Sequence, residues 1–275
     1  MNKSMRWSVG FISVLTILLG FSVMLNATLF KRAKAYYTEL NAVRLDPIGL
    51  SCFDLNTRDR DTQLPEVPVS GQSVTRFVFV GDSRASSWPS PVMEGAEFIN
   101  RGVGSQTTTQ VLQRYSAHVS PLKPDVVIVQ VGINDLKTIG LFPDRLSDII
   151  ADAQTNIEQI VKQAMAQGST VVLIPILPAG EISLARRPFW SDQIDAAVLT
   201  VNQQLLNFAK SSPPGSIIWF DGYSEIVDER GRVSAEYQKD ELHLNDLGYE
   251  VLNKALVEKL SQLNLRKTKA SNSDD

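Results

Sequence analysis

Cysteine and histidine are nearly absent from this chain. Among its 275 residues there is one cysteine, Cys52, so no disulfide can form within the chain. Cys52 follows a poor lipobox at 49–51 and lies far beyond the apolar N-terminal segment, which favours a small apolar residue over a lipid attachment site. The two histidines are His118 and His243. Any reaction that needs an imidazole as general base must use one of them.

A surplus of positive charge is also missing. Lys and Arg total 27 and Asp and Glu total 30, which gives a formal net charge of −3. Proteins whose main partner is a nucleic acid neutralise phosphates with clustered basic side chains, so this class of partner is not expected. The 43% of hydrophobic residues and 21% of charged residues are typical of a globular protein. The length allows one good-sized domain and an appendage.

One long segment near the N-terminus contains no charged residue. The run 9–30 is uncharged and just long enough to cross a membrane as a helix, which takes about 20 apolar residues. Lys3 and Arg6 precede it, as in a signal sequence. The cleavage-like site 33–35 lies behind the cations at 31–32, a poor position, so an uncleaved anchor is favoured over a cleaved signal peptide.

Basic residues flank both ends of the apolar run, so the positive-inside rule does not decide its orientation. A signal-anchor with its short end in the cytoplasm places the rest of the chain outside, and we expect this single-pass, extracytoplasmic arrangement. Secretion after signal cleavage is the alternative. Residues 31–74 are expected to form a stalk and linker, 75–265 the folded domain, and 266–275 a polar, disordered tail.

Short apolar runs alternate with helical patterns between the linker and the tail. The runs are β-branched and nearly continuous, as in parallel strands that are covered on both faces. They predict a parallel sheet of about five strands in a three-layer α/β/α sandwich of the flavodoxin-like kind. The expected strands are 76–80, 97–100, 125–131, 170–176 and 216–220, and the expected helices are 108–118, 146–167, 192–210 and 246–263.

The motif GDSR follows the first expected strand at 81–84. A glycine permits a sharp turn, after which Ser83 lies at the mouth of the sheet near a helix start, where backbone N–H groups can face an oxyanion. Taken alone, an Asp-Ser pair at this place is more often a helix cap.

Two further turns follow the second and third strands. The Gly-rich segment 100–108 can offer backbone donors to an oxyanion or a phosphate, or it can simply be a tight turn with a helix cap. The motif GIND at 132–135 can aim the amide of Asn134 at the same point, or it can form an Asx-turn.

Asp240 and His243 stand three residues apart just before the last expected helix. This spacing lets the carboxylate accept the imidazole Nδ1–H and leaves Nε2 free to act as a base. An incidental acidic loop is the alternative, but it does not explain why one of only two histidines lies here.

These four motifs occur in order, each at the carboxyl end of a strand or in the loop before the final helix. Over residues 75–262 the chain resembles the SGNH hydrolases, also called GDSL-like lipases and esterases. The resemblance implies that Ser83 is the nucleophile, that Asn134 is a side-chain oxyanion donor, and that His243 is the base, oriented by Asp240. The backbone N–H of Ser83 would be a second donor.

Two departures from the family pattern concern the neighbourhood of the nucleophile. The usual leucine after the nucleophile is Arg84 here, which is expected to affect packing or substrate contacts rather than bond-making. The position of the oxyanion glycine in the second block is occupied by Ser105, with Gly104 just before it. The third donor is a backbone N–H, so either Gly104 or Ser105 can supply it.

Other candidates lie around these motifs. Arg84, Trp88 and Trp190 are expected to contribute to substrate binding, although packing explains both tryptophans equally well. His118 closes a helical run, where an imidazole can interact with the helix C-terminus, and is not expected to be catalytic.

The chemistry implied is hydrolysis of acyl or acetyl esters of a small molecule, a lipid or a glycan. It needs no metal and no organic cofactor. An acyltransferase would use the same triad, and a non-catalytic binding protein on this fold is a further alternative. The sequence does not indicate the oligomeric state.

Overall fold

The computed structural model describes residues 3–45 and 74–262. The chain divides into two compact units, residues 1–44 and 45–275, and each is described by itself. The greater part of the expected linker, including Cys52, and the expected disordered tail lie outside the described residues.

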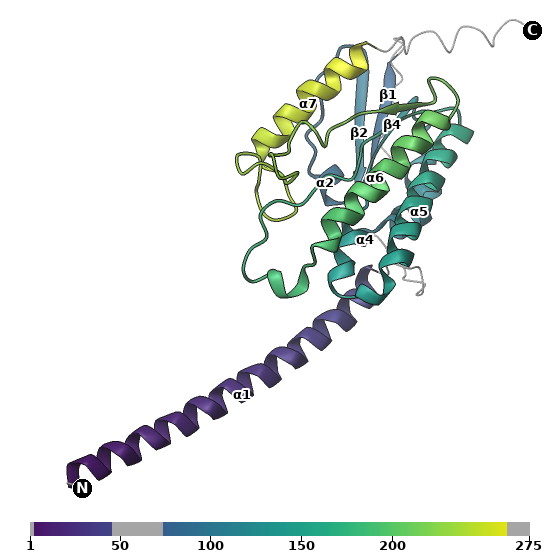
Figure 1. Ribbon diagram of the computed structural model, residues 1–275. Helices are drawn as coiled ribbons and strands as arrows, with labels where there is room; N and C mark the ends of the chain where they lie inside the picture. The colour runs from purple at the N-terminus through teal and green to yellow at the C-terminus, as the bar shows by residue number, and fades with distance from the viewer. Residues whose placement is uncertain (1–2, 46–73, 263–275) are drawn as a thin grey trace, which may run out of the picture. The chain divides into compact units, whose positions relative to one another are not determined.

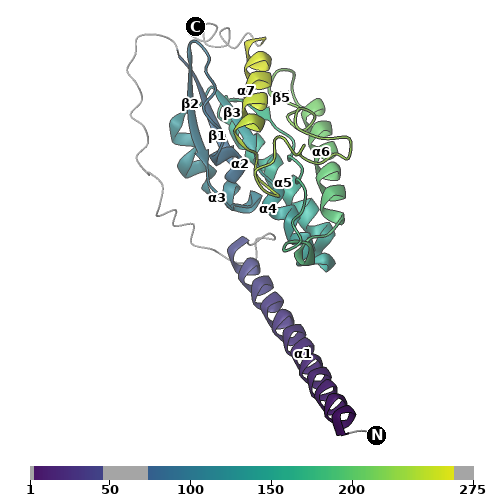
Figure 2. The same ribbon diagram turned by 90° about the vertical axis from the view of Figure 1, so that its left-hand side faces the viewer.

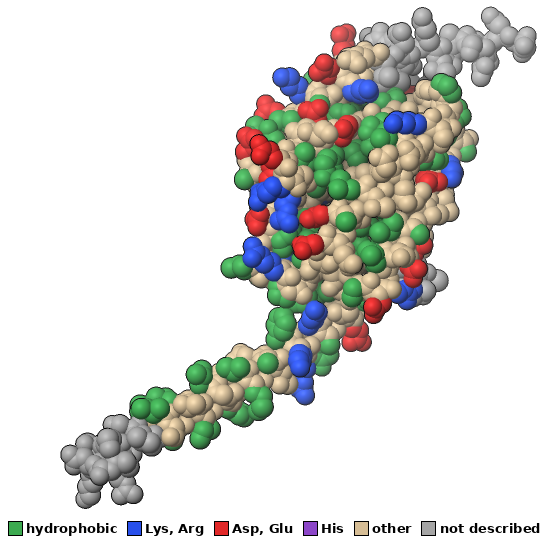
Figure 3. Space-filling view, in the orientation of Figure 1, with side chains coloured by type: hydrophobic (Ala, Val, Ile, Leu, Met, Phe, Trp, Pro, Cys, Tyr) green, Lys and Arg blue, Asp and Glu red, His purple; other side chains and the backbone are tan. Residues whose placement is uncertain are grey.

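The first unit is a single helix, α1, which runs from Lys3 to Leu45 (Figure 1). It therefore includes the apolar run and continues into the expected stalk without a break. Exposed apolar side chains line it, as the green atoms in Figure 3 show. By length and composition alone it can cross a membrane, and it is consistent with a signal anchor or a signal peptide.

The second unit is built on a parallel sheet of five strands in the order β2-β1-β3-β4-β5 (Figures 1 and 2). The register places Val78 of β1 between Ile99 of β2 and Val127 of β3. The strands are β1 Thr75–Gly81, β2 Ala96–Gly102, β3 Val126–Gln130, β4 Thr170–Leu173 and β5 Ile217–Trp219.

Alternate side chains of each strand enter different cores because successive residues of a strand point to opposite faces. Val78 and Val80 pack with the helices α3 (Thr108–His118), α5 (Leu146–Ala166) and α6 (Gln193–Ser211). Phe77 and Phe79 pack with α7 (Asp246–Ser261) on the other face. Both faces are covered, so the predicted α/β/α sandwich is confirmed.

The chain also contains short helices that apolar periodicity did not indicate. Two α-helical turns follow the first and third strands, α2 (Ser83–Ser86) and α4 (Ile133–Leu136). The 3-10 turns are η1 Ser120–Leu122, η2 Lys137–Gly140, η3 Pro143–Arg145 and η4 Arg187–Phe189. Both α2 and α4 begin at the carboxyl ends of strands, where the candidate site is built.

The strand order reverses direction at the centre of the sheet. β2 lies on one side of β1, and β3 lies on the other side, so the connections leave β1 and β3 toward opposite edges. In open α/β sheets, ligands bind outside the carboxyl ends of the strands at such a switch point.

Candidate active site

Ser83 is held at the first residue of α2 by a tight turn after β1. Gly81 is required there, because an added Cβ would come 1.8 Å from the carbonyl oxygen of Gln130 on β3. Asp82 caps the helix, since its Oδ1 accepts a hydrogen bond of 2.9 Å from the backbone N–H of Arg84. The turn thus presents the partly exposed Ser83 hydroxyl above the carboxyl edge of the sheet.

His243 reaches this hydroxyl from a segment 160 residues away. Its Nε2 lies 2.9 Å from Ser83 Oγ, and its Nδ1 lies 2.8 Å from Oδ2 and 2.9 Å from Oδ1 of Asp240. An ionised carboxylate only accepts hydrogen bonds, so this pairing keeps the proton on Nδ1 and leaves Nε2 as the acceptor toward Ser83. His243 is therefore within hydrogen-bonding distance of both Ser83 and Asp240, as the motifs led us to expect.

The carboxylate of Asp240 is kept ionised by its surroundings. Partial burial opposes ionisation, but hydrogen bonds from the N–H groups of Leu242 and His243 and from the His243 ring lower the pKa of Asp240. The same two backbone bonds, both 2.9 Å long, fold the loop back so that residues 240 and 243 face each other.

The loop with Asp240 and His243 is fixed at both ends. Lys239 donates its N–H to the carbonyl of His243, and Gln238 forms an antiparallel bridge with Leu244. Asn245 then caps α7 by accepting a 3.0 Å hydrogen bond from the N–H of Gly248. The imidazole is therefore held between a short bridge and a helix start.

The Gly-rich turn after β2 lies directly beside Ser83. Gly102 packs on α2 so closely that a Cβ would come 2.2 Å from the backbone nitrogen of Ser86. A Cβ on Gly104 would lie 3.9 Å from the Cβ of Ser83. Ser105 adopts a φ of 65°, a left-handed conformation that favours glycine. The turn thus brings Gly104 close to Ser83, and a backbone oxyanion donor at residue 104 or 105 stays a prediction.

Asn134 lies on α4, immediately after β3, and its side chain is almost fully buried. Its Nδ2 donates to the carbonyl of Gln106 at 2.9 Å, and its Oδ1 accepts from the ammonium of Lys137 at 2.6 Å. The orientation of the amide is therefore fixed at both of its polar ends. One of the two protons on Nδ2 is free of this bond to Gln106 and is the candidate oxyanion donor.

Asp135, the next residue, ties this turn to α3. Its carboxylate accepts from the backbone N–H of Thr108 at 3.0 Å and from the Thr108 hydroxyl at 2.6 Å. Complete burial raises the pKa of Asp135 to about 7, although the bonds from Thr108 favour the ionised form. The carboxylate therefore connects the GIND motif at 132–135 to α3, the helix that follows the Gly-rich turn.

Arg84 is fully buried, in contrast to its predicted role in substrate binding. Its guanidinium donates to the carbonyl oxygens of Leu177, Pro178 and Leu242. A side chain whose donors are engaged with three carbonyls below the surface does not reach a bound substrate. The other expectation, an effect on packing, describes it correctly: Arg84 joins the nucleophile turn to two other loops.

Trp88 also departs from the rim position that was predicted. Its ring is 3% exposed, packs against Phe79 and Tyr249, and donates its N–H to Asn253 at 2.7 Å. The indole is thus a core residue, because its apolar ring and its one polar atom are both satisfied inside the domain.

Trp190 is half-buried and lies near the third motif. The segment 189–190 packs on Gly140, where an added Cβ would come 2.2 Å from the carbonyl oxygen of Phe189. Gly140 ends η2, which begins three residues after Asn134. A role of Trp190 at the substrate rim stays a prediction.

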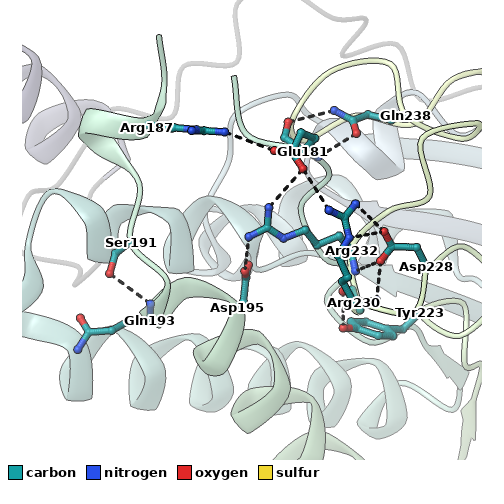
Figure 4. A network of polar contacts seen from close by, with 11 residues as sticks. Glu181, Arg187, Ser191, Gln193, Asp195, Tyr223, Asp228, Arg230, Arg232 and Gln238 are labelled. Atoms are coloured by element: carbon teal, nitrogen blue, oxygen red, sulfur yellow. Dashed lines mark hydrogen bonds and ion pairs between the residues drawn. The ribbon is translucent and has the colours of Figure 1, made fainter. Parts of the chain in front are cut away.

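A polar network stabilises the loop between β4 and α6 against the segment before His243 (Figure 4). Gln238 pairs with the backbone of Glu181 through both its amide oxygen and its amide nitrogen, at 2.9 and 3.1 Å. The Glu181 carboxylate lies within 4 Å of three guanidinium groups, those of Arg187, Arg230 and Arg232. Exposed ion pairs of this kind each add little to stability, so we expect the two hydrogen bonds of Gln238 to hold these segments together more than the ion pairs do.

No group of three or more His, Cys, Asp or Glu side chains that could hold a metal ion occurs within residues 3–45 and 74–262.

His118 ends α3, as expected. Burial, together with the cations Arg114 and Arg101, lowers its pKa. The candidate site consists of the linked side chains of Ser83, His243 and Asp240, the neighbouring Gly104, and Asn134, which is bonded to Gln106 of the same turn.

Sequence reasoning missed two residues that hold this arrangement. Lys137 lies three positions after Asn134, a spacing that brings side chains together on a helical turn and could have indicated the contact. Thr108 was expected only as a possible helix cap, and its bonds to Asp135 join segments 27 residues apart.

Residues 70–251, more than half of the chain, match the model of the GDSL-like lipase/acylhydrolase family. The chain therefore belongs to this family. No curated protein sequence matches the chain.

Solved structures share the fold. A Bacteroides fragilis protein assigned as an acylhydrolase is 24% identical, with 75% of this chain and 96% of that chain covered and a TM-score of 0.62. A lipase/acylhydrolase from Enterococcus faecalis is 23% identical, with coverage of 69% and 96% and a TM-score of 0.52. An acetyl xylan esterase from Geobacillus stearothermophilus is 14% identical, with coverage of 68% and 96% and a TM-score of 0.53. At these identities the likeness concerns the fold alone.

Proposed function

We propose that this member of the family is a serine ester hydrolase in which Ser83 is the nucleophile and His243 and Asp240 are its partners. The observation that carries the proposal is the pair of contacts made by one imidazole, 2.9 Å to the Ser83 hydroxyl and 2.8 Å to the Asp240 carboxylate. A base that is within reach of a nucleophile and oriented by a third group is the arrangement that activates a serine hydroxyl.

The reaction proceeds in two steps. His243 Nε2 takes the Ser83 proton while Oγ bonds to the ester carbonyl carbon, and the imidazolium then protonates the departing alcohol as its C–O bond breaks. Water repeats these steps on the acyl-enzyme and releases the acid. Asp240 stabilises the imidazolium, and its lowered pKa keeps it ionised for this role.

The negative oxygen formed in each step is stabilised by three donors. These are the backbone N–H of Ser83, a backbone N–H at Gly104 or Ser105, and the side-chain amide of Asn134. In other hydrolases, loss of one such donor costs about 3 to 4 kcal/mol of transition-state stabilisation. Gly104 lies next to Ser83, and the Asn134 amide donates to the carbonyl of Gln106 in the same turn. Both contacts favour this assignment.

The substrate proposed is an acyl or acetyl ester of a small molecule, a lipid or a glycan. Both lipid and glycan esters occur in the names of the structural relatives, a lipase/acylhydrolase and an acetyl xylan esterase. We further propose that α1 is an uncleaved signal-anchor that holds the catalytic unit outside the cytoplasm, with release by signal cleavage as the alternative.

The test is hydrolysis of p-nitrophenyl acetate and p-nitrophenyl octanoate by the full chain in mild detergent, beside Ser83→Ala. We expect activity in the parent and a loss of at least about 1000-fold in the variant. The ratio of acetate to octanoate turnover then indicates which acyl chain length the site prefers. Activity that survives Ser83→Ala would mean that another residue is the nucleophile.

The two alternatives give different outcomes in the same assay. An acyltransferase would form the transfer product when an acceptor alcohol competes with water. A binding protein would turn over neither ester, although the complete set of contacts among Ser83, His243 and Asp240 argues against a degraded site.

A further inference from the structure

Lys137 lies directly behind the proposed oxyanion donor. It begins η2, three residues after Asn134, and its ammonium donates a 2.6 Å hydrogen bond to Asn134 Oδ1. This contact decides the orientation of the amide, because an ammonium is a donor only and must face the oxygen. Nδ2 is thereby turned toward Gln106 and the site, where it donates at 2.9 Å.

The surroundings of Lys137 are charged on several sides. The carboxylates of Asp82, next to the nucleophile, and Asp135, next to Asn134, favour its protonated form. The guanidinium groups of Arg186 and Arg84 oppose that form, and burial opposes it most of all. Burying a cation costs free energy unless it is paired, and the ammonium of the half-buried Lys137 donates a hydrogen bond to Asn134.

We propose that Lys137 is a positioning residue of the oxyanion hole, which orients the Asn134 amide and increases its strength as a donor. This inference rests on the proposed esterase activity. A cation bonded to an amide oxygen draws electron density from the nitrogen, so the N–H that faces the substrate becomes a better donor.

The contribution is specific to the transition state. The carbonyl oxygen of a bound ester carries little charge, whereas the tetrahedral intermediate carries a full negative charge at the same place. An electrostatic effect relayed through Asn134 therefore acts on kcat and leaves KM nearly unchanged.

The first test compares Lys137→Met, Lys137→Arg and the parent, each as the full chain in mild detergent. We expect Lys137→Met to lower kcat about 10- to 100-fold with little change in KM, somewhat less than removal of a direct donor. Lys137→Arg keeps a cation behind the amide and is expected to recover much of kcat. Lys162→Met, which removes an exposed lysine paired with Glu158 on α5, is the matched control and should leave kcat unchanged.

A double variant separates a relayed effect from general destabilisation. If Lys137 acts through Asn134, Lys137→Met has little further effect on kcat in an Asn134→Ala background. A merely structural lysine would lower the rate by the same factor in both backgrounds.

The pH profile of kcat gives an independent readout. Burial, outweighing Asp82 and reinforced by Arg186, lowers the pKa of Lys137 from its ordinary 10.5. The kcat of the parent should therefore fall as the pH rises through the lowered pKa of Lys137, because the ammonium becomes neutral. This fall should occur at a lower pH than the one at which an ordinary lysine loses its proton. In Lys137→Met this alkaline decline should be absent, because the group that titrates is gone.

The outcomes are distinguishable. A folded parent that hydrolyses no ester overturns the proposed function and this inference with it. An active parent with an equally active Lys137→Met variant overturns the inference alone and leaves the esterase in place. A loss that Lys137→Arg does not relieve, or that persists at full size in Asn134→Ala, also contradicts the relay.

Discussion

At the scale of single residues, Arg84 connects the nucleophile to the rest of the site. Its backbone belongs to the turn with Ser83, and Tyr249 of α7 donates its hydroxyl to the Arg84 carbonyl at 2.9 Å. Its guanidinium reaches Leu242, the neighbour of His243. One side chain thus helps to set the distance between Ser83 and His243, which the leucine usual at this position in the family cannot do through hydrogen bonds.

Replacing Arg84 with methionine is therefore expected to lower the free energy of unfolding by about 3 kcal/mol or more, because two buried carbonyl oxygens and one partly buried carbonyl oxygen lose their donor. Esterase kcat should fall as well, since the loop of His243 loses its link to α2. Denaturant unfolding and ester hydrolysis measure the two effects. Arg145→Met, which removes an arginine from an exposed ion pair with Asp148, should cost at most about 0.5 kcal/mol. A cost for Arg84→Met no larger than this control would contradict the assignment.

Asp135 is the second residue with a measurable signature. Its pKa is raised from 3.8 to about 7 by burial, so the folded state holds the proton more tightly than the unfolded state. Stability is therefore lost as pH rises from the unfolded value toward the folded one, and it levels off above that value.

In Asp135→Asn this pH dependence should vanish. The free energy of unfolding of the parent, relative to the variant, is expected to fall between about pH 4 and about pH 7, with a slope of up to about 1.4 kcal/mol per pH unit. Urea unfolding of both proteins across this range measures the difference. A constant difference would show that folding does not raise the pKa of Asp135.

At the scale of elements, regular strands and helices were predictable, whereas the turns were not. Continuous β-branched runs mark strands buried on both faces, which is why the sheet and helices such as α5 were located from the sequence. α2 and α4 have four residues each, too few to display a helical period. The side chains of Trp88 and Arg84 form hydrogen bonds to segments 93 to 165 residues away, so their burial was not visible in local sequence.

The turn between β2 and α3 is the element on which a further prediction rests. Ser105, with its φ of 65°, occupies the family's glycine position. Ser105→Gly should keep kcat near the parent value and raise the free energy of unfolding by up to about 1 kcal/mol. Ser105→Val should lower kcat at least about 10-fold, since a β-branched residue moves the backbone donor out of place.

Lys123 offers a matched control for this pair. It is the other non-glycine residue with positive φ in the described part of the chain, at 48°, and it caps η1 away from the proposed site. Lys123→Gly and Lys123→Val should change stability in the same directions without affecting kcat. If Ser105→Val leaves kcat unchanged as well, the turn does not supply an oxyanion donor.

At the scale of the whole molecule, the sequence predicted the sheet, the approximate boundaries of its helices and the residues that meet above it. Sheet topology could predict that Ser83 and Asn134 lie at one edge, because the carboxyl ends of parallel strands gather there. The roles expected for them and for His243 came from the resemblance to the SGNH hydrolases. The contacts of Arg84 could be found only in the three-dimensional structure, whereas the spacing of Lys137 from Asn134 could have indicated their contact.

The central claim is that Ser83 is a nucleophile activated by His243, and the most direct test is covalent labelling. An alkyl fluorophosphonate is added to the full chain in mild detergent, and the modified residue is identified by mass spectrometry. We predict one equivalent of label per chain, on Ser83, with labelling at least about 100-fold slower in His243→Ala. Label on another residue, or unmodified Ser83 in a folded protein, would contradict the account.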